Sequence, residues 1–128
     1  MSEFSDFLED KLLDITLKGG AAYNVGTTYL AIFTADPTDA GTGTECSYTG
    51  YARQAMAFGT ISGGAVSTSS TINYPAMVGS DITVTHLGIY DAASGGNLLY
   101  HTALDVSKIL QADDVASFAS GEVTVTLT

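Results

Sequence analysis

The sequence predicts a mainly β protein, an antiparallel β-sandwich or jelly roll that carries one N-terminal amphipathic α-helix. Two observations predict this fold class. Apolar residues recur at helical spacing near the N-terminus, whereas the rest of the 128-residue chain consists of short β-branched and aromatic runs between Gly- and Ser-rich turns. No second amphipathic segment is present to connect parallel strands, which argues against a parallel α/β fold. We therefore expect a single domain, with the helix in residues 1–20 and the β-sandwich in residues 21–128.

The helix is expected over residues 3–17. Spacings of three and four place one apolar stripe on this helix, formed by Phe4, Phe7, Leu8, Leu12 and Ile15. Ser2 is the expected N-cap, and the two glycines after Lys18 supply a left-handed residue that ends the helix. Because Leu13 and Leu17 widen the stripe, this helix needs a surface to cover.

The β-strands are expected where β-branched and aromatic residues cluster. They lie at residues 27–34, 53–58, 71–74, Ile82–Tyr90, 97–103, 106–111, 115–119 and 123–127. The clearest alternation is in Ile82–Tyr90. It predicts that Val84 points to one face of the sheet and that Leu87 and Ile89 point to the other. A turn of the hairpin kind is expected at residues 93–96, directly after this strand.

Two long segments, residues 36–50 and 60–70, contain few residues that could form a core and are expected to be loops. Loops of this kind are often where a β-sandwich contacts a partner. The Ser-, Gly- and Thr-rich stretch at residues 59–70 could equally be a threonine-rich edge strand with its flanking turns.

Composition excludes several classes of function. The chain has 14 acidic and four basic residues, for a net charge of −10, and its basic residues are scattered, so nucleic-acid binding is not expected. No apolar run approaches the roughly 18 residues that cross a bilayer, and no basic leader precedes one, so neither membrane insertion nor secretion is expected. Cys46 is the single cysteine, which excludes an intrachain disulfide and a cysteine-rich zinc site.

No catalytic, cofactor-binding or metal-ligating residue is predicted. The chain lacks a Gly-x-Ser-x-Gly motif, and His86 and His101 both lie inside expected strands, where hydrogen-bonded structural histidines are the favoured interpretation. The two histidines could meet across a hairpin and bind a metal with Asp91 or Asp105, but a plain cross-strand pair is preferred. The acidic residues of the 36–50 loop do not match the spacing of a calcium-binding loop.

Three segments resemble a known family of small structural proteins of tailed bacteriophages. They are SDFLEDKLLDITLKG near the N-terminus, GYARQAMAF in the centre and HLGIYDAASGGNLLYHTAL, and the ending at residues 113–127 also fits. Members of this family are variously described as tail-fibre, head decoration or capsid cement proteins. The resemblance covers most of the chain and contains no catalytic signature.

The resemblance implies a non-enzymatic virion structural protein without cofactors, made in the cytoplasm of the host bacterium. The favoured interpretation is a capsid cement or decoration protein on the outer head surface. There it would bridge subunits of the major capsid protein and act as a homo-oligomer, a dimer or a trimer. The alternative is a tail-fibre or adhesin module that binds a host receptor or glycan.

Contacts with such partners are expected at the helix and at one polar position in the body. The candidate interface residues are Phe4, Phe7, Leu8, Leu12, Tyr51 and Arg53. The helix either caps its own sandwich or packs against a symmetry mate or the shell. The only arginine of the chain is expected to pair with a carboxylate or with backbone carbonyls, either inside the protein or at an interface.

Overall fold

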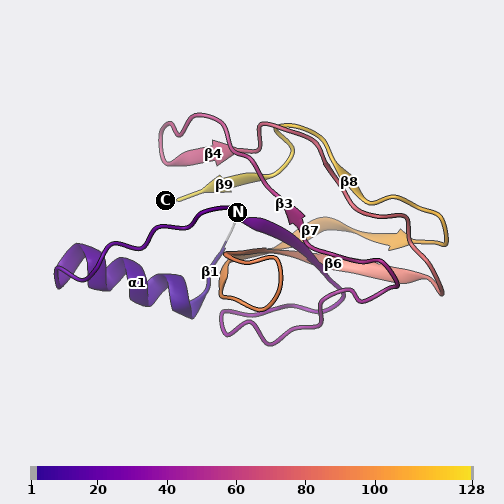
Figure 1. Cartoon of the computed structure of the whole chain (residues 1–128), viewed down its shortest axis with the longest axis horizontal. Coiled ribbons are helices and arrows are strands. Elements are labelled where there is room, and N and C mark those ends of the chain that lie inside the picture. The colour runs from indigo at the N-terminus through magenta and orange to yellow at the C-terminus, as the bar shows by residue number, and fades with distance from the viewer. Residues whose placement is uncertain (1–2, 128) are drawn as a thin grey trace.

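A computed structural model describes residues 3–127, which form one helix and nine strands (Figure 1). In chain order the elements are β1 (Glu3–Phe4), α1 (Asp6–Leu17), β2 (Tyr29–Phe33), β3 (Gln54–Ala55), β4 (Ala65–Ser67), β5 (Ile72–Asn73), β6 (Ile82–Tyr90), β7 (Leu98–Leu110), β8 (Ser117–Phe118) and β9 (Thr124–Thr126). Five strands form one antiparallel sheet in the order β1-β7-β6-β2-β3. The remaining four form two separate antiparallel ribbons, β4-β9 and β5-β8.

The centre of the sheet consists of β2, β6 and β7. The sequence YLAIF of β2 is buried along nearly its whole length, because apolar side chains on both of its faces are covered. In the β2–β6 register Tyr29 lies opposite Tyr90 and Phe33 lies opposite His86. The hairpin between β6 and β7 then brings the two longest strands of the chain side by side.

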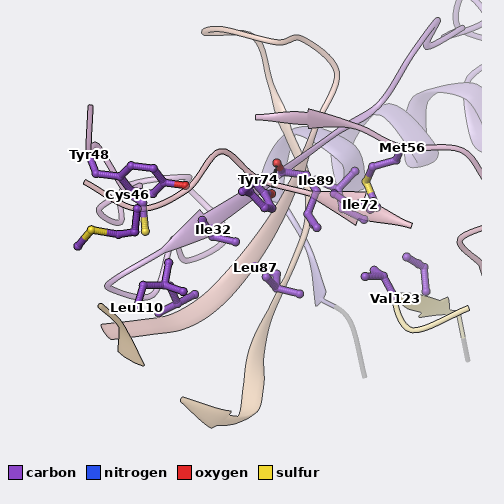
Figure 2. Close-up of a cluster of buried hydrophobic side chains, with 14 residues drawn as sticks. Ile32, Cys46, Tyr48, Met56, Ile72, Tyr74, Leu87, Ile89, Leu110 and Val123 are labelled. Carbon is purple, nitrogen blue, oxygen red and sulfur yellow. Dashed lines mark hydrogen bonds between the residues drawn. The ribbon is translucent and has the colours of Figure 1, made fainter. Parts of the chain in front are cut away.

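The main core lies between this sheet and the two ribbons. Figure 2 shows Ile32 and Leu87 of the sheet gathered with Ile72 and Val123 of the opposite layer. The mainly β fold with one N-terminal helix is therefore confirmed. The two ribbons do not join into one second sheet and the strands described do not close into a barrel, so a sandwich or jelly roll is not confirmed.

A second, smaller cluster lies on the other face of the sheet. It contains Ala31, Phe33, Tyr90 and Leu98, and the Phe33 and Tyr90 rings stack with centroids 6.3 Å apart. Gly88 lies under this cluster, where a Cβ atom would be 2.8 Å from the Phe33 ring and 3.0 Å from Leu98. The cluster therefore requires a residue without a side chain at this point of β6.

The limits of β6 are those that the sequence predicts, and Leu87 and Ile89 lie on the face opposite Tyr90 as the alternation predicts, but the predicted orientation of Val84 is wrong. Val84, Leu87 and Ile89 all belong to the main core and therefore lie on the same side of the sheet. The β6–β7 register shifts between Val84 and His86, and such an irregularity interrupts strict alternation along a strand. Tyr90 lies in the cluster on the opposite face.

The helix begins three residues later than predicted. Glu3 and Phe4 are extended and pair with β7, and Ser5 is the N-cap. The predicted N-cap, Ser2, lies outside the described residues. The C-terminal end is as expected, because α1 stops at Leu17 and Gly19 adopts a left-handed φ of +65°.

Several other strands differ from the prediction in length. The expected strands at 97–103 and 106–111 form the single strand β7, whereas 53–58, 71–74 and 115–119 are reduced to short pairings. In the 60–70 segment the structure contains β4, so the edge-strand alternative for this stretch is confirmed. The 36–50 segment contains no strand longer than an isolated bridge between Glu45 and Phe33.

Candidate functional site

Helix α1 leaves two of its apolar residues, Leu13 and Leu17, exposed. Among the described elements it packs only against β1 and β7, and it extends beyond the sheet at one end of the molecule (Figure 1). Leu8 is buried, and the half-buried Phe7 meets the edge of the Tyr23 ring at 5.5 Å between centroids. Leu13 and Leu17 are 56% and 75% exposed. Leu12 and Ile15 are half-buried, so part of the apolar surface of the helix covers the chain's own body, as one of the two expectations has it. Packing of the exposed Leu13 and Leu17 against a partner stays a prediction.

The first turn of α1 is fixed to the sheet by polar contacts. Buried Ser5 donates hydrogen bonds from its Oγ and its backbone N–H to two carbonyl oxygens at the start of β7. Its Oγ also accepts a hydrogen bond from the Leu8 N–H at 3.2 Å, which is the N-cap contact that starts the helix. The Asp6 N–H donates to the Asp39 carbonyl at 2.9 Å. The helix is thus held at its N-terminal end by β7 and by the loop after β2.

Beside this junction, two histidines and three carboxylates form a group that we call the histidine–carboxylate cluster. The His101 side chain is 3% exposed, and its Nε2 lies 2.7 Å from Oδ1 of Asp39. Its Nδ1 lies 3.6 Å from Oε2 of Glu3 and 4.0 Å from Oδ1 of Asp36. The Nε2 of His86 lies 4.0 Å from the other oxygen of Asp36. Four segments of the chain therefore meet at His101.

The structure modifies the prediction for the two histidines. They are not directly opposite each other, because His101 pairs with Gly88 while His86 pairs with Ala103. The bond from His101 to the loop carboxylate confirms that it is a hydrogen-bonded structural histidine. Asp91, one of the two carboxylates considered as a metal ligand with them, bonds elsewhere, to a tyrosine and an asparagine.

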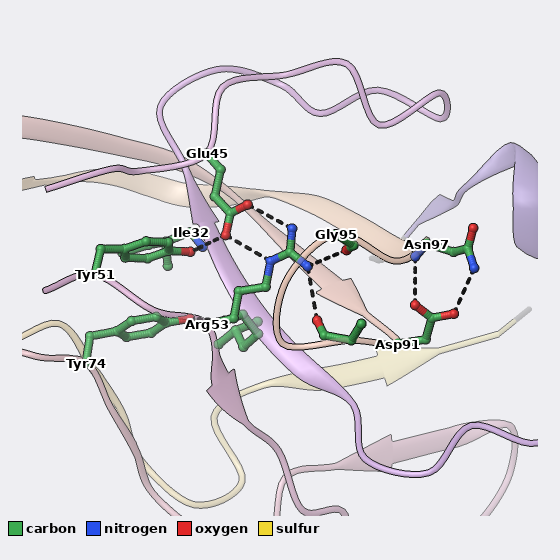
Figure 3. A network of polar contacts seen from close by, with 10 residues as sticks. Ile32, Glu45, Tyr51, Arg53, Tyr74, Asp91, Gly95 and Asn97 are labelled. Carbon is green, nitrogen blue, oxygen red and sulfur yellow. Dashed lines mark hydrogen bonds and ion pairs between the residues drawn. The ribbon is translucent and has the colours of Figure 1, made fainter.

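A second polar network is centred on Arg53 (Figure 3). Its side chain is 9% exposed. Its Nε and Nη2 atoms donate hydrogen bonds to the two carboxylate oxygens of Glu45, and both donor–acceptor distances are 3.0 Å. Nη1 donates to the carbonyls of Ala92 at 3.0 Å and Gly95 at 2.8 Å. The guanidinium also lies 3.5 Å from the centroid of the Tyr90 ring. The structure thus combines the carboxylate pair and the backbone contacts that the sequence predicts for this residue.

The charges of this network are stabilised by its own members. Burial lowers the pKa of the Arg53 guanidinium, but the hydrogen bonds and charge of Glu45 outweigh that effect, so its pKa lies above the usual value. The Tyr51 hydroxyl donates to Glu45 Oε2 at 2.6 Å and accepts from the Ile32 N–H at 3.3 Å. Burial and the hydrogen bond to Glu45 raise the pKa of Tyr51. The network therefore keeps one charge pair and one neutral phenol, and it ties two loops to β2.

The hairpin turn at residues 91–97 is fixed from both sides. Arg53 binds its carbonyls, and Asp91 accepts hydrogen bonds from the backbone and side-chain nitrogens of Asn97 at 2.7 and 2.9 Å and from the Tyr23 hydroxyl at 2.7 Å. Burial raises the pKa of Asp91, but these three hydrogen bonds outweigh it and lower the pKa, while burial and the bond to Asp91 raise the pKa of Tyr23 to about 12. The turn predicted at 93–96 is thus confirmed, with Gly95 left-handed at φ +63°.

The predicted interface residues lie in two separate places. Phe4, Phe7, Leu8 and Leu12 are at the root and first turns of α1, and Phe4 meets the Tyr100 ring edge-on at 5.5 Å. The other two, Tyr51 and Arg53, belong to the polar network around Glu45 and are largely enclosed by the β body. A contact of any of the six with a partner stays a prediction. Sequence reasoning missed the carboxylates around His101, because they come from a two-residue strand and from a loop, neither of which has a local pattern.

Two other kinds of site are absent from the part of the chain that the structure describes. Within residues 3–127, no group of three or more His, Cys, Asp or Glu side chains is placed to hold a metal ion. The helix in that range is too short and too polar to cross a membrane.

Comparison with known proteins identifies the family of the chain. Residues 3–126 match the family described as Podophage GP4 fiber I protein gp80. No curated protein matches the chain. The family description favours the fibre alternative over a place on the capsid surface, and the match covers all but the two ends of the sequence. The chain therefore belongs to the Podophage GP4 fiber I protein gp80 family, a family of non-enzymatic structural fibre proteins of the phage virion.

Proposed function

We propose that this protein is a structural subunit of a phage fibre that joins a neighbouring virion protein through helix α1. The β body acts as a rigid support and carries out no chemistry. One observation carries the proposal: the helix is firmly fixed at its root, yet its C-terminal half exposes Leu13 and Leu17. Fully burying a leucine side chain contributes roughly 1.5–3 kcal/mol, so covering these two side chains would favour assembly.

The position of the exposed residues supports an attachment role. Leu13 and Leu17 are four residues apart, so they lie on one side of the helix, one turn from each other. Figure 1 shows that this part of α1 extends beyond the sheet, where a neighbouring protein has access to it. The helix-in-groove mode, in which an apolar helix face is laid into a partner's groove, suits such an element.

The choice of neighbour is the finer part of the proposal. The family description favours another fibre component as the neighbour. Binding to the major capsid protein stays a prediction. A dimer or trimer of this chain also stays a prediction, as does binding of a host receptor or glycan. In each of these arrangements, the proposal requires α1 to be covered in the assembled particle.

Replacing both exposed leucines tests the proposal. We expect the double variant Leu13→Gln/Leu17→Gln to fold with an unchanged melting temperature, because both side chains are mostly exposed and glutamine is a good helix former. Its incorporation into virions, measured by mass spectrometry of purified particles, should fall at least about tenfold, since lost burial of two leucines exceeds 1.4 kcal/mol.

The matched control is Ile61→Gln/Val106→Gln, which removes two apolar side chains of comparable exposure, 75% and 68%, from the β body. This control should assemble like the wild type. Normal incorporation of the helix variant would overturn the proposal. Loss of incorporation in the control alone would place the attachment surface on the β body instead.

A further inference from the structure

We propose that helix α1 is covered by a virion protein of different sequence, whose surface offers an apolar groove flanked by several Lys or Arg side chains. The inference rests on the proposed function, because it names the chemistry of the partner to which α1 attaches. It depends on the six exposed residues of the helix, which we call the exposed face of α1: Asp6, Glu9, Asp10, Leu13, Thr16 and Leu17.

The exposed face occupies one side of the helix. Residues of an α-helix follow one another at about 100° around its axis, so these six side chains lie within an arc of about 120°. The buried Leu8 and the half-buried Ile15 lie outside this arc. So do the two lysines of this region. Lys11 is half-buried, with its Nζ 5.8 Å from the centroid of the Phe7 ring, and Lys18 follows the last turn. The exposed face therefore contains no base.

Acidic and apolar residues are separated along the exposed face. Its N-terminal half carries three carboxylates, and its C-terminal half carries Leu13 and Leu17. At a rise of 1.5 Å per residue, the centres of the two groups are about 10 Å apart. Within residues 3–127 none of the three carboxylates forms a salt bridge. A surface that covers the leucines therefore also meets uncompensated negative charge, which is costly to desolvate unless cations face it.

The helix of a second copy does not meet this requirement. If two such helices paired in parallel through their exposed faces, the carboxylates of one would face the carboxylates of the other, and like charges would repel. If they paired in antiparallel fashion, Leu13 and Leu17 of each helix would lie against the carboxylates of the other. Both arrangements leave negative charges without cations at the contact. Self-association through α1 is therefore disfavoured.

The β body of a second copy lacks the required cations. The whole chain has four Lys and Arg residues. Two of them belong to the helix and its C-cap, and Arg53 is 9% exposed and already bound to Glu45. Lys108 is the base that remains as an exposed residue of the β body, and one cation does not match three carboxylates. The complementary groove must therefore come from a protein of different sequence.

Charge reversal on the exposed face tests the chemistry of the partner. Glu9→Lys/Asp10→Lys keeps both leucines. Its incorporation into virions, measured by mass spectrometry of purified particles, should fall at least about tenfold, because like charges would then meet across the interface. The control Asp81→Lys/Asp105→Lys makes the same change in net charge at two exposed carboxylates of the β body, and it should assemble like the wild type. Circular dichroism of each isolated variant establishes that it is folded.

A neutral variant keeps the test decisive if the lysine variant fails to fold. Glu9→Gln/Asp10→Gln removes the two charges without creating repulsion, so it should lose part of its incorporation. Normal incorporation of either folded charge variant would overturn the inference, and so would an equal loss in the β-body control. If Leu13→Gln/Leu17→Gln is lost from virions while the charge variants are retained, attachment through α1 stands and the basic groove does not. If all are retained, the proposed function fails as well.

The isolated chain gives a second test that involves no virion. Sedimentation of the wild type and of Leu13→Gln/Leu17→Gln at equal concentration should give the same mass, because no second copy covers α1. An oligomer of the wild type that the leucine variant loses would show that a second copy does cover the helix, and it would overturn the inference.

Discussion

Replacement of Arg53 by alanine is expected to lower the free energy of unfolding by about 3 kcal/mol, measured by urea denaturation. The wild-type guanidinium is 9% exposed and satisfies the 25% exposed Glu45 and two carbonyl groups of the 91–97 turn. The alanine variant leaves the Glu45 carboxylate enclosed with only the Tyr51 hydroxyl as a partner. It also removes the cation that lies on the Tyr90 ring.

Two controls separate geometry from charge. Arg53→Lys keeps the positive charge but cannot form the two-pronged contact with Glu45, so its loss should be intermediate. Lys108→Ala removes an exposed cation from β7 and should change the stability by less than about 0.5 kcal/mol. If Arg53→Ala cost under about 1 kcal/mol, the network would be no stronger than a surface ion pair.

The second large effect is expected at Phe33, which is 1% exposed in the cluster on the outer face of the sheet. Phe33→Ala should lower the free energy of unfolding by about 3–5 kcal/mol, because it leaves a cavity beneath Tyr90. Gly88→Ala alone should cost about 1–3 kcal/mol, since the new methyl group would meet the Phe33 ring.

The combination of these two changes gives the sharper measurement. In the Phe33→Ala background the new methyl group at position 88 no longer meets the ring, and Leu98 can shift into the space that the ring leaves, so Gly88→Ala should cost far less there than in the wild type. Urea denaturation of the four proteins in this double-mutant cycle gives the coupling energy. Strictly additive losses would contradict the close packing of Phe33 over Gly88.

The sequence predicted those elements whose own residues favour a helix, a strand or a turn. The stripe of α1 and the strands β2 and β6 follow from periodicity, and the turn after β6 follows from its glycines. What could not be predicted depends on contacts between distant segments. Two-residue β1 is a strand only because β7 lies beside it, and the register shift near Val84 has no signature in the sequence.

The same distinction applies to the candidate site. A lone arginine in an apolar segment predicted a structured pair, and the structure contains it. The surroundings of His101 could not be predicted, because Glu3 and Asp39 are brought to it by the N-terminal strand and by a loop without regular structure. The exposure of Leu13 and Leu17 on α1 also depends on tertiary structure, because an apolar stripe does not specify which surface it will contact.

The central claim, that α1 is the element through which this fibre subunit is attached, is tested most directly by cryo-electron microscopy of the virion. The account predicts density for the chain in a fibre, with Leu13 and Leu17 covered by a neighbouring protein and the β body unchanged. A particle in which both leucines face solvent, or in which the chain lies on the capsid shell with its helix uncovered, would contradict it.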